Sequence, residues 1–288
     1  MKIHRIKTGL VRIKENQISK TKGLTPQMLK VLFGKKWAEW VPIYAWVIEH
    51  PEGTIVVDTG ETAKTAEHGY LPKWHPYYAL SVQFRVKSEE EIGPQLQKLG
   101  INPAKDVKKV ILTHMHTDHA GGLGHFPNSE ILIEKSEYNT ASGITGKLAG
   151  YLPHRWPEWL KPNLIALTNE PYFNFNQSLA VTADRKVIIV ATPGHSANHI
   201  SVIAEIDGIH YFLAGDTSYT QENLINLRPD GIGTDESINT LKNILSFSKV
   251  NPTIYLHSHD PLVPQRMTNM ETIPSINDGV IAPLEKVN

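Results

Sequence analysis

The 288-residue sequence contains no cysteine. Neither a disulfide framework nor thiolate metal ligation is therefore available, and every metal ligand must offer nitrogen or oxygen. Net charge is absent as well, because 29 Lys and Arg residues balance 29 Asp and Glu residues. Since no global positive field attracts a phosphate backbone, we expect no nucleic-acid partner.

Long hydrophobic runs are also missing. No apolar stretch reaches the length of about 18 residues that a membrane-spanning helix needs. The charged, alternating residues 1–7 lack the apolar segment of a signal peptide. We therefore expect a soluble cytoplasmic protein without a membrane partner, and the length suits a single domain over residues 1–288.

The most informative stretch is His114-Met115-His116-Thr117-Asp118-His119, which follows the apolar run 110–112. Three imidazoles and a carboxylate would be costly in a hydrophobic core, because buried polar groups need partners. Neutral imidazole and carboxylate instead suit zinc, and a catalytic zinc site keeps one position open for water. Four such groups so close together indicate two ions that share a water. A loop of solvated histidines is the alternative.

Four further polar motifs each follow an apolar run that predicts a strand. They are Asp58-Thr59-Gly60, Pro193-Gly194-His195, Gly215-Asp216 and Ser258-His259-Asp260. Together with residues 114–119, and in chain order, they resemble the motifs of the metallo-β-lactamase superfamily over about residues 40–262. The resemblance implies an α+β fold, a four-layer αββα sandwich with two packed sheets inside and helices outside.

The resemblance also implies a dinuclear metal site. Two divalent ions would be held by His114, His116 and His195 on one side, by Asp118, His119 and His259 on the other, and by a bridging Asp216. Zinc is the expected metal, with cobalt, manganese and iron as alternatives. Asp58 would accept a hydrogen bond from a ligand histidine, or else bond only local amides as a turn residue. The motif assigns the ligand role to His259 rather than to His257, and His199 is expected to support or pack.

A longer match follows the proposed bridging carboxylate. Residues 216–223, Asp-Thr-Ser-Tyr-Thr-Gln-Glu-Asn, resemble a run of the N-acyl-homoserine lactonases in which the tyrosine faces the metals. By that resemblance, a metal-bridging hydroxide attacks the lactone carbonyl and Tyr219 donates a hydrogen bond to the developing oxyanion. Asp118 then returns a proton to the leaving ring oxygen. The predicted activity is lactone opening in quorum quenching, and the alternative for Tyr219 is packing under its loop.

Two aromatic-rich insertions, at about 61–87 and 142–163, are long for simple connections and predict a substrate lid or a subunit interface. With the aromatic segment 37–46, they offer a groove for the acyl chain of a small-molecule lactone. The candidate substrate-binding residues are Trp37, Trp40, Trp74, Tyr78 and Trp156. Trp37 and Trp40 would equally suit core packing, and the extra aromatic surface would suit a homodimer.

Other hydrolases of the superfamily remain alternatives: a thioesterase of the glyoxalase type, another lactonase or esterase, a phosphodiesterase or nuclease, or a β-lactamase. A glyoxalase-type enzyme should carry a basic C-terminal region, whereas residues 261–288 are short and near neutral. A phosphodiesterase or nuclease should place Lys or Arg beside the site. From another class, a redox or purely metal-binding module is an alternative that metal analysis would separate from a hydrolase.

The remaining patterns predict the elements around these motifs. Alternation of apolar and polar residues over 2–14 predicts an edge strand or a hairpin. Capping residues predict a helix from Ser88 to about Leu99. A longer helix is predicted from about residue 235 to 247, and the turn Asp207-Gly208 predicts a hairpin.

Overall fold

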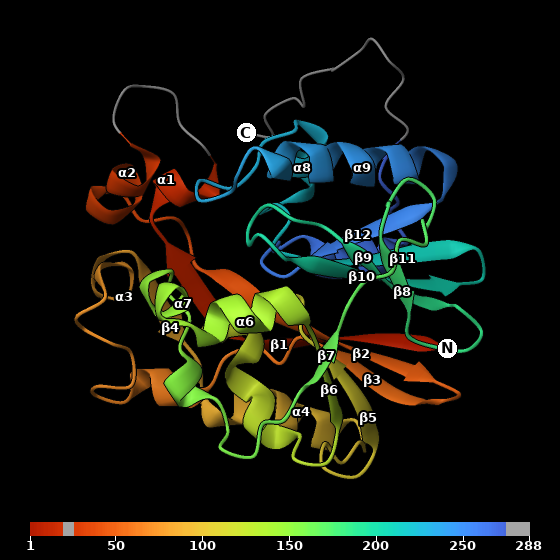
Figure 1. Ribbon diagram of the computed structural model, residues 1–288, viewed down its shortest axis with the longest axis horizontal. Coiled ribbons are helices and arrows are strands. Elements are labelled where there is room, and N and C mark those ends of the chain that lie inside the picture. Colours follow the sequence, from red (N-terminus) through yellow and green to blue (C-terminus); the bar gives the residue numbers. More distant parts are fainter. Residues whose placement is uncertain (20–25, 275–288) are drawn as a thin grey trace.

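The structure, a computed structural model, describes residues 1–19 and 26–274. Two β-sheets form its centre (Figure 1). The larger sheet has seven strands in the order β4-β1-β2-β3-β5-β6-β7. Its strands are β1 (Lys2–Ile13), β2 (Val41–His50), β3 (Gly53–Val57), β4 (Val82–Arg85), β5 (Val107–Ile111), β6 (Glu130–Glu134) and β7 (Asn163–Ile165).

The smaller sheet has five strands in the order β12-β11-β10-β9-β8. They are β8 (Ser178–Ala180), β9 (Val187–Ala191), β10 (Ile200–Ile206), β11 (Ile209–Gly215) and β12 (Thr253–His257). Because β10 is antiparallel to both β9 and β11, and β12 is parallel to β11, the strands β9, β11 and β12 run in one direction. The predicted hairpin at Asp207-Gly208 is confirmed as the connection between β10 and β11.

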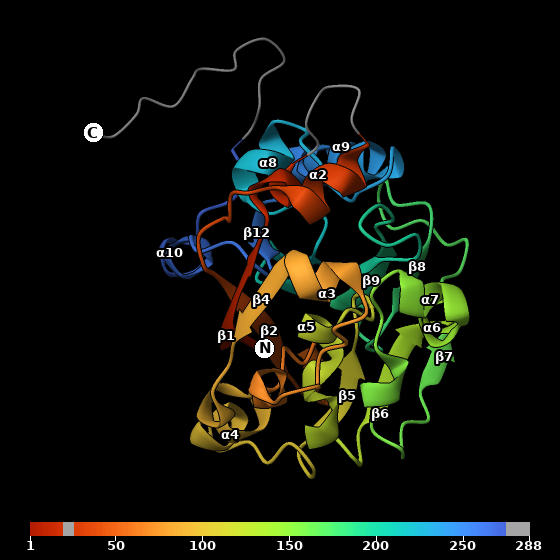
Figure 2. The ribbon, with the colours of Figure 1, turned by 90° about the vertical axis from the view of Figure 1, so that its left-hand side faces the viewer.

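Ten helices lie around the two sheets in the described residues. They are α1 (Glu15–Ile18), α2 (Gln27–Phe33), α3 (Pro76–Leu80), α4 (Ile92–Lys98), α5 (Thr117–Ala120), α6 (Lys135–Ser142), α7 (Ile144–Leu148), α8 (Gln221–Ile225), α9 (Glu236–Val250) and α10 (Val263–Asn269). Figures 1 and 2 show α8 and α9 outside the smaller sheet and α4 outside the larger one. The predicted four-layer αββα sandwich is therefore confirmed. Within the described residues, no helix has the length and apolar character needed to span a membrane.

Apolar layers between the sheets and outside them hold this sandwich together. Between the sheets, Trp46 of β2 is buried in one cluster with Val202 of β10 and Leu256 of β12. Outside the smaller sheet, Leu241 of α9 packs with Phe212 of β11. Since burial of apolar surface is the main favourable term in folding, these layers fix the two sheets against each other.

All five sequence motifs follow the carboxyl ends of strands. In the larger sheet, Asp58 follows β3 and His114 follows β5, and these two strands are parallel. In the smaller sheet, His195, Asp216 and His259 follow β9, β11 and β12. Because each set of strands runs in one direction, each sheet collects its polar motifs at one edge, as the carboxyl ends of parallel strands do in open sheets.

Some predicted elements are wrong. The strand β1 is neither an edge strand nor a hairpin, because it pairs with β2 on one side and with β4 on the other. Its partner β4 and the helix α3 come from the 61–87 segment, which is thus partly built into the sheet. The helix expected from Ser88 begins at Ile92, after a short 3-10 turn over Ser88–Glu90.

Candidate metal centre

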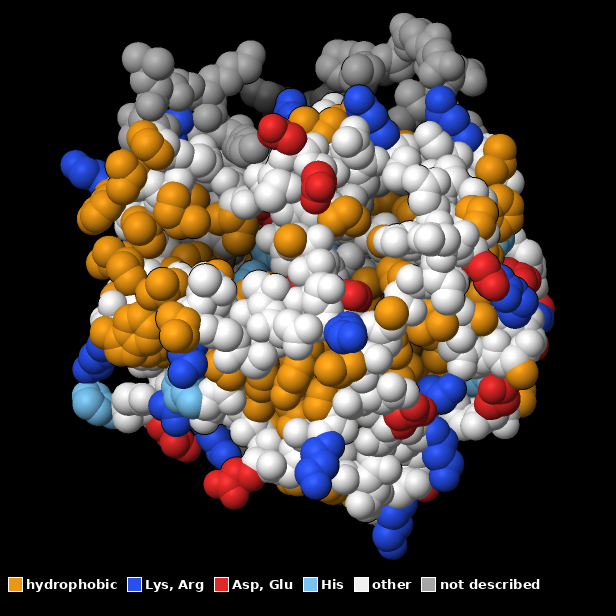
Figure 3. Space-filling view, viewed as in Figure 1, with side chains coloured by type: hydrophobic (Ala, Val, Ile, Leu, Met, Phe, Trp, Pro, Cys, Tyr) orange, Lys and Arg blue, Asp and Glu red, His pale blue; other side chains and the backbone are white. Residues whose placement is uncertain are grey.

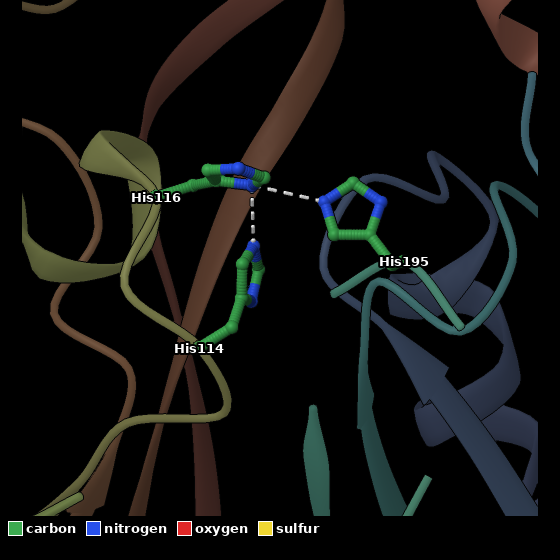
Figure 4. A group of neighbouring side chains, drawn as sticks. All are labelled: His114, His116 and His195. Carbon is green, nitrogen blue, oxygen red and sulfur yellow. Dashed lines mark hydrogen bonds between the residues drawn. The ribbon is translucent and has the colours of Figure 1, made fainter. Parts of the chain in front are cut away.

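Three histidine rings meet at one point of the site (Figure 4). The Nδ1 atom of His116 lies 3.0 Å from Nε2 of His114 and 3.0 Å from Nε2 of His195. His114 and His116 come from the loop after β5 in the larger sheet, and His195 comes from the loop after β9 in the smaller sheet. Three ring nitrogens that converge in this way form a ligand group of the kind that binds zinc.

A second ligand group lies beside the first. The ligand atoms of Asp118, His119 and His259 all lie within 4.8 Å of one another. Asp216 faces both groups, because its Oδ2 is 3.6 Å from Nε2 of His195 and 3.4 Å from Nε2 of His259. The structure therefore brings together all seven residues that the sequence indicated as ligands.

The donor set fits divalent metal ions. Nε2 of His119 and Oδ1 of Asp216 are buried, 3.4 Å apart, and neither has a hydrogen-bond partner among the described residues. Buried polar atoms are rarely left in this state, and a metal ion would satisfy both. Imidazole nitrogen and carboxylate oxygen are ligands that zinc and its neighbours accept.

Hydrogen bonds to the outer nitrogen fix the direction of three rings. The Nδ1–H group of His119 donates to Asp58 at 2.8 Å, and the Nδ1–H group of His195 donates to Asp230 at 2.6 Å. In His259, Nδ1–H donates to the carbonyl oxygen of Pro42 at 2.9 Å. In each neutral ring the lone pair is therefore on Nε2, which points into the site, and this is the arrangement that a metal ligand requires.

Two other buried histidines are engaged in ways that do not suit a metal ligand. Nδ1 of His257 accepts a hydrogen bond from the backbone N–H of His259 at 2.8 Å, so the proton of the neutral ring is on Nε2. Nε2 of His199 accepts from the backbone N–H of Asp216 at 3.1 Å. Neither ring offers a free lone pair to the site, because Nε2 of His257 carries the ring proton and the lone pair on Nε2 of His199 is taken by the N–H of Asp216. The hydrogen bonds thus favour His259 over His257 as the ligand.

Asp58 lies beneath the site. Its backbone adopts φ of 58°, which is unusual for a residue with a side chain and is typical of tightly constrained positions. Its carboxylate accepts hydrogen bonds from the backbone N–H of Thr113 at 2.8 Å and from Nδ1–H of His119. The contact predicted for Asp58 is thus present, together with a second contact that holds the start of the His114 loop.

Gly215 allows the bridging carboxylate to reach the centre. Its φ is +56°, and a Cβ atom there would lie 2.5 Å from Nε2 of His199 and 2.9 Å from Cβ of Thr113. Only glycine avoids both the steric contact and the cost of the left-handed conformation. The glycine therefore lets the chain turn sharply so that Asp216 enters between the two ligand groups.

The charges in the site shift the pKa values of its rings in different directions. Burial, together with neighbouring histidines, holds the pKa of His114 and of His116 well below its ordinary value. Burial also lowers the pKa of His195, but the carboxylates of Asp230 and Asp216 outweigh it and raise this pKa to about 9. Without metal, His195 is therefore protonated on both nitrogens at neutral pH.

This proton predicts a pH-dependent metal affinity. A metal ion that binds Nε2 of His195 must displace a proton below about pH 9 and none above it. We expect the apparent affinity to fall as the pH falls below about 9, by about tenfold per pH unit for this proton, and protons displaced from His119 and His259, whose pKa values the carboxylate of Asp216 also raises, add to the slope. Calorimetric zinc titrations of the metal-free protein across this range measure the slope. An affinity that does not change with pH would contradict the prediction.

Two supporting carboxylates were not predicted from the sequence. Asp230 orients His195 and lies in a Pro-Asp-Gly run that reads as an ordinary turn. Glu137, 1% exposed, accepts hydrogen bonds from the backbone N–H of Met115 and from the hydroxyls of Tyr151 and Ser196. An acid in the first turn of a helix normally indicates capping, so the sequence offered no signal for this role.

A cavity of about 240 Å³ opens beside the ligand groups. His116, Asp118, His195, Asp216, His259 and Tyr219 border it on one side. The remaining wall is mainly apolar and includes Val11, Ile13, Met28, Leu32, Val41, Tyr77, Val82, Phe84, Leu148 and Ile232. Figure 3 shows hydrophobic side chains gathered on the left of this face, over the region of α2 and α3. The site therefore combines metal ligands with an apolar binding space.

Of the five predicted substrate-binding aromatic residues, only Tyr78 borders this cavity. Trp37 and Trp40 instead stack against cationic side chains, with the guanidinium of Arg12 at 5.0 and 4.7 Å from their ring centroids. Trp74 is 63% exposed, and Trp156 stacks on Tyr138. Cation–π attraction and aromatic stacking account for the positions of Trp37, Trp40 and Trp156 without a substrate.

Tyr219 lies in the cavity wall rather than only under its loop. Its ring centroid is 6.4 Å from that of His259, and its hydroxyl accepts a hydrogen bond from Nε2 of Gln17 at 3.1 Å. Burial raises the pKa of this phenol well above its ordinary value, and nearby carboxylates add to the effect. The hydroxyl therefore keeps its proton and can donate it in a hydrogen bond.

Comparison with known proteins places this geometry in a family. The chain is 26% identical to the N-acyl homoserine lactonase AttM of Rhizobium radiobacter over 229 residues, which is 77% of this chain and 82% of that protein. It is 28% identical to an N-acyl homoserine lactonase of Bacillus cereus over 227 residues, which is 76% and 82% of the two chains.

Solved structures share the fold. One is an N-acyl homoserine lactone hydrolase with the product N-hexanoyl-L-homoserine at its catalytic metal centre, with a TM-score of 0.70, 23% identity, and coverage of 94% of this chain and 97% of that chain. Another is AidC, a dizinc quorum-quenching lactonase, with a TM-score of 0.58, 18% identity, and coverage of 90% and 87%. A model of the metallo-β-lactamase superfamily matches residues 38–259, which is most of the chain. The protein therefore belongs to the metallo-β-lactamase superfamily.

Proposed function

We propose that this protein is a dinuclear metal hydrolase that opens the lactone ring of N-acyl-homoserine lactones. The observation that carries the proposal is the combination of two adjoining ligand groups with a donor hydroxyl, Tyr219, on the wall of one apolar cavity. The relatives reported above are lactonases of this kind, which adds support at modest sequence identity. Zinc is the proposed native metal, since it accepts imidazole nitrogen and carboxylate oxygen, and cobalt, manganese and iron are the alternatives.

The metals and the side chains have separate tasks. Two bound divalent ions would lower the pKa of a shared water and polarise the carbonyl group. Tyr219 donates a hydrogen bond to the carbonyl oxygen as negative charge develops there. Asp118, whose Oδ2 lies 3.4 Å from Nε2 of His259, takes a proton from the attacking water and returns it to the leaving ring oxygen.

The apolar wall would receive the acyl chain. Val11 and Ile13 of β1, Val82 and Phe84 of β4 and Leu148 of α7 surround the cavity. A small-molecule site of this kind combines a mostly apolar lining with a few polar groups that orient the reacting bond. We therefore propose that the wall binds the acyl chain while the lactone ring faces the metal ligands.

The test is the rate of acid release from N-acyl-homoserine lactones of short and long acyl chain by the metal-loaded protein. A thioester and a phosphodiester are assayed in parallel, and every assay is repeated with a chelator. Fast, chelator-sensitive opening of lactones alone would support the proposal, and faster opening of long chains would support the role of the apolar wall. Hydrolysis of the thioester or phosphodiester without lactone opening would contradict the proposal and identify the protein as a thioesterase or a phosphodiesterase.

Replacement of Tyr219 by Phe should lower the turnover number by about tenfold to a thousandfold, because the transition state loses one hydrogen-bond donor. The metal content should stay at the wild-type value, since Tyr219 lies outside the ligand groups. Tyr211→Phe is the matched control, because that hydroxyl contacts only the sulfur of Met270 at 3.5 Å among the described residues. Unchanged turnover in Tyr219→Phe would leave Tyr219 with a packing role.

A further inference from the structure

Gln17 belongs to the N-terminal helix α1, yet it borders the cavity at the metal centre. Its side chain is 2% exposed. Its carbonyl oxygen accepts a hydrogen bond from the backbone N–H of Gly231 at 2.6 Å. A Cβ atom on Gly231 would lie 2.9 Å from Cα of Gln17, so glycine permits this close approach. The position of Gln17 relative to Asp230, the partner of His195, is therefore fixed through the backbone.

The amide nitrogen of Gln17 is fully used. Nε2 donates one hydrogen bond to the hydroxyl of Tyr77 at 2.8 Å and one to the hydroxyl of Tyr219 at 3.1 Å. A side-chain amide has two N–H donors, so both are engaged. Because the oxygen of Tyr219 is the acceptor in this contact, its own O–H remains available to the cavity.

The amide oxygen of Gln17 has no partner. Oε1 is buried and makes no hydrogen bond within the described part of the chain. An amide oxygen in this position costs free energy until a donor reaches it, and native structures rarely leave one unpaired without a reason. An unpaired acceptor on a residue that borders a binding cavity is suited to a ligand that carries an N–H or O–H group.

The proposed substrate carries such a group next to its reacting carbonyl. In an N-acyl-homoserine lactone, the amide nitrogen is bonded to the ring carbon adjacent to the lactone carbonyl. In the Gln17 side chain, the oxygen and nitrogen of the amide are about 2.3 Å apart by standard bond dimensions. Oε1 therefore lies close to the nitrogen that contacts the Tyr219 hydroxyl, just as the N–H of the substrate lies close to its reacting carbonyl.

We propose that Gln17 is a specificity-determining residue that reads the amide N–H of the substrate with Oε1 while its Nε2 holds the Tyr219 hydroxyl. This inference rests on the proposed function. It divides lactones into two classes by chemistry, those with an N–H group beside the ring carbonyl and those without. The acyl chain itself makes no difference to this contact.

The test compares two substrates in the metal-loaded protein. One is an N-acyl-homoserine lactone, and the other is its ester counterpart, in which an oxygen atom replaces the amide N–H. The variant Gln17→Met keeps the length of the side chain but removes its amide. Its kcat/KM for the amide substrate should fall about tenfold more than its kcat/KM for the ester. The reason is that only the amide substrate loses a hydrogen bond from its N–H to Oε1. Loss of the contact to Tyr219 should lower kcat equally for both substrates.

Controls separate recognition from structure. Gln265→Met changes the same residue type at an exposed position on α10 and should leave both substrates unaffected. Metal content and thermal unfolding are measured for each variant. If Gln17→Met does not fold, the wild-type preference for the amide over the ester, expected at about tenfold or more, provides the readout.

The outcomes are distinct. Equal losses for amide and ester in Gln17→Met, or no loss for either, would overturn the recognition role and leave the proposed function intact. In the wild-type readout, equal kcat/KM values for the two substrates would do the same. A wild-type protein that opens neither lactone would overturn the proposed function, and this inference with it.

Discussion

Replacement of Asp118 by Asn should lower the turnover number for lactone opening by about 10²- to 10⁴-fold, the usual range for loss of a general acid–base group. Asn keeps an oxygen in the position of a ligand atom but cannot carry the transferred proton. KM should change much less than kcat, because the apolar wall of the cavity is unaltered. Steady-state kinetics and metal analysis on the same preparation measure both effects.

An exposed aspartate away from the metal centre provides a matched control. Asp207 lies in the exposed turn between β10 and β11 with φ of 51°, a conformation that Asn tolerates well. Asp207→Asn should therefore leave turnover and metal content unchanged. If Asp118→Asn retained both metals and full activity, the proton-transfer role of Asp118 would be wrong.

Replacement of Glu137 by Leu should reduce the free energy of unfolding of the metal-free protein by about 3 kcal/mol or more. The reason is that three buried donors, on Met115, Tyr151 and Ser196, lose their acceptor at once, and each unpaired donor costs about 1–3 kcal/mol. Metal affinity should also fall, because Met115 lies between two ligand histidines and Ser196 follows a third. Urea unfolding and zinc titration measure the two effects.

Glu137→Gln and Glu130→Gln complete this series. Glu137→Gln keeps one acceptor oxygen and should lose less stability than Glu137→Leu. Glu130 is exposed and accepts a hydrogen bond from Asn163, so Glu130→Gln should change stability by no more than about 0.5 kcal/mol. A loss below about 1 kcal/mol in Glu137→Leu would show that Glu137 does not hold the two loops.

The positions of the metal ligands could be predicted because local sequence specifies them. Each motif follows an apolar run that forms a strand, and the strands of each sheet end at one edge. His116 and His195 therefore meet although they lie 79 positions apart in the chain. The spacing of polar residues within a short loop is sufficient information for this part of the site.

Unlike Asp58, the supporting residues Gln17 and Glu137 could not be predicted, because no local motif marks them and their partners are distant in sequence. Gln17 reaches Tyr219 across 202 residues, and Glu137 reaches Ser196 across 59. Each of these residues looks ordinary in its own segment, a glutamine in a short helix or an acid in a first turn. Their roles arise from tertiary packing, which no local pattern records.

The cavity wall was predicted only in part. Tryptophan content indicated a groove, but Trp37 and Trp40 pack against Arg12 and most of the wall is aliphatic. Several wall residues come from β1 and β4, and β4 lies in a segment that looked like a connection. Strand pairing over long sequence separation, here between β1 and β4, decided where the apolar side chains gather.

The division of ligands between the two sheets has a consequence for the order of folding. Each ligand group needs a histidine from the smaller sheet, His195 for one and His259 for the other, besides residues from the loop after β5. Neither sheet alone can assemble a three-residue group. During refolding, tight metal capture therefore has to wait until the sheets have docked, and metal uptake would time that docking step separately from the formation of the strands.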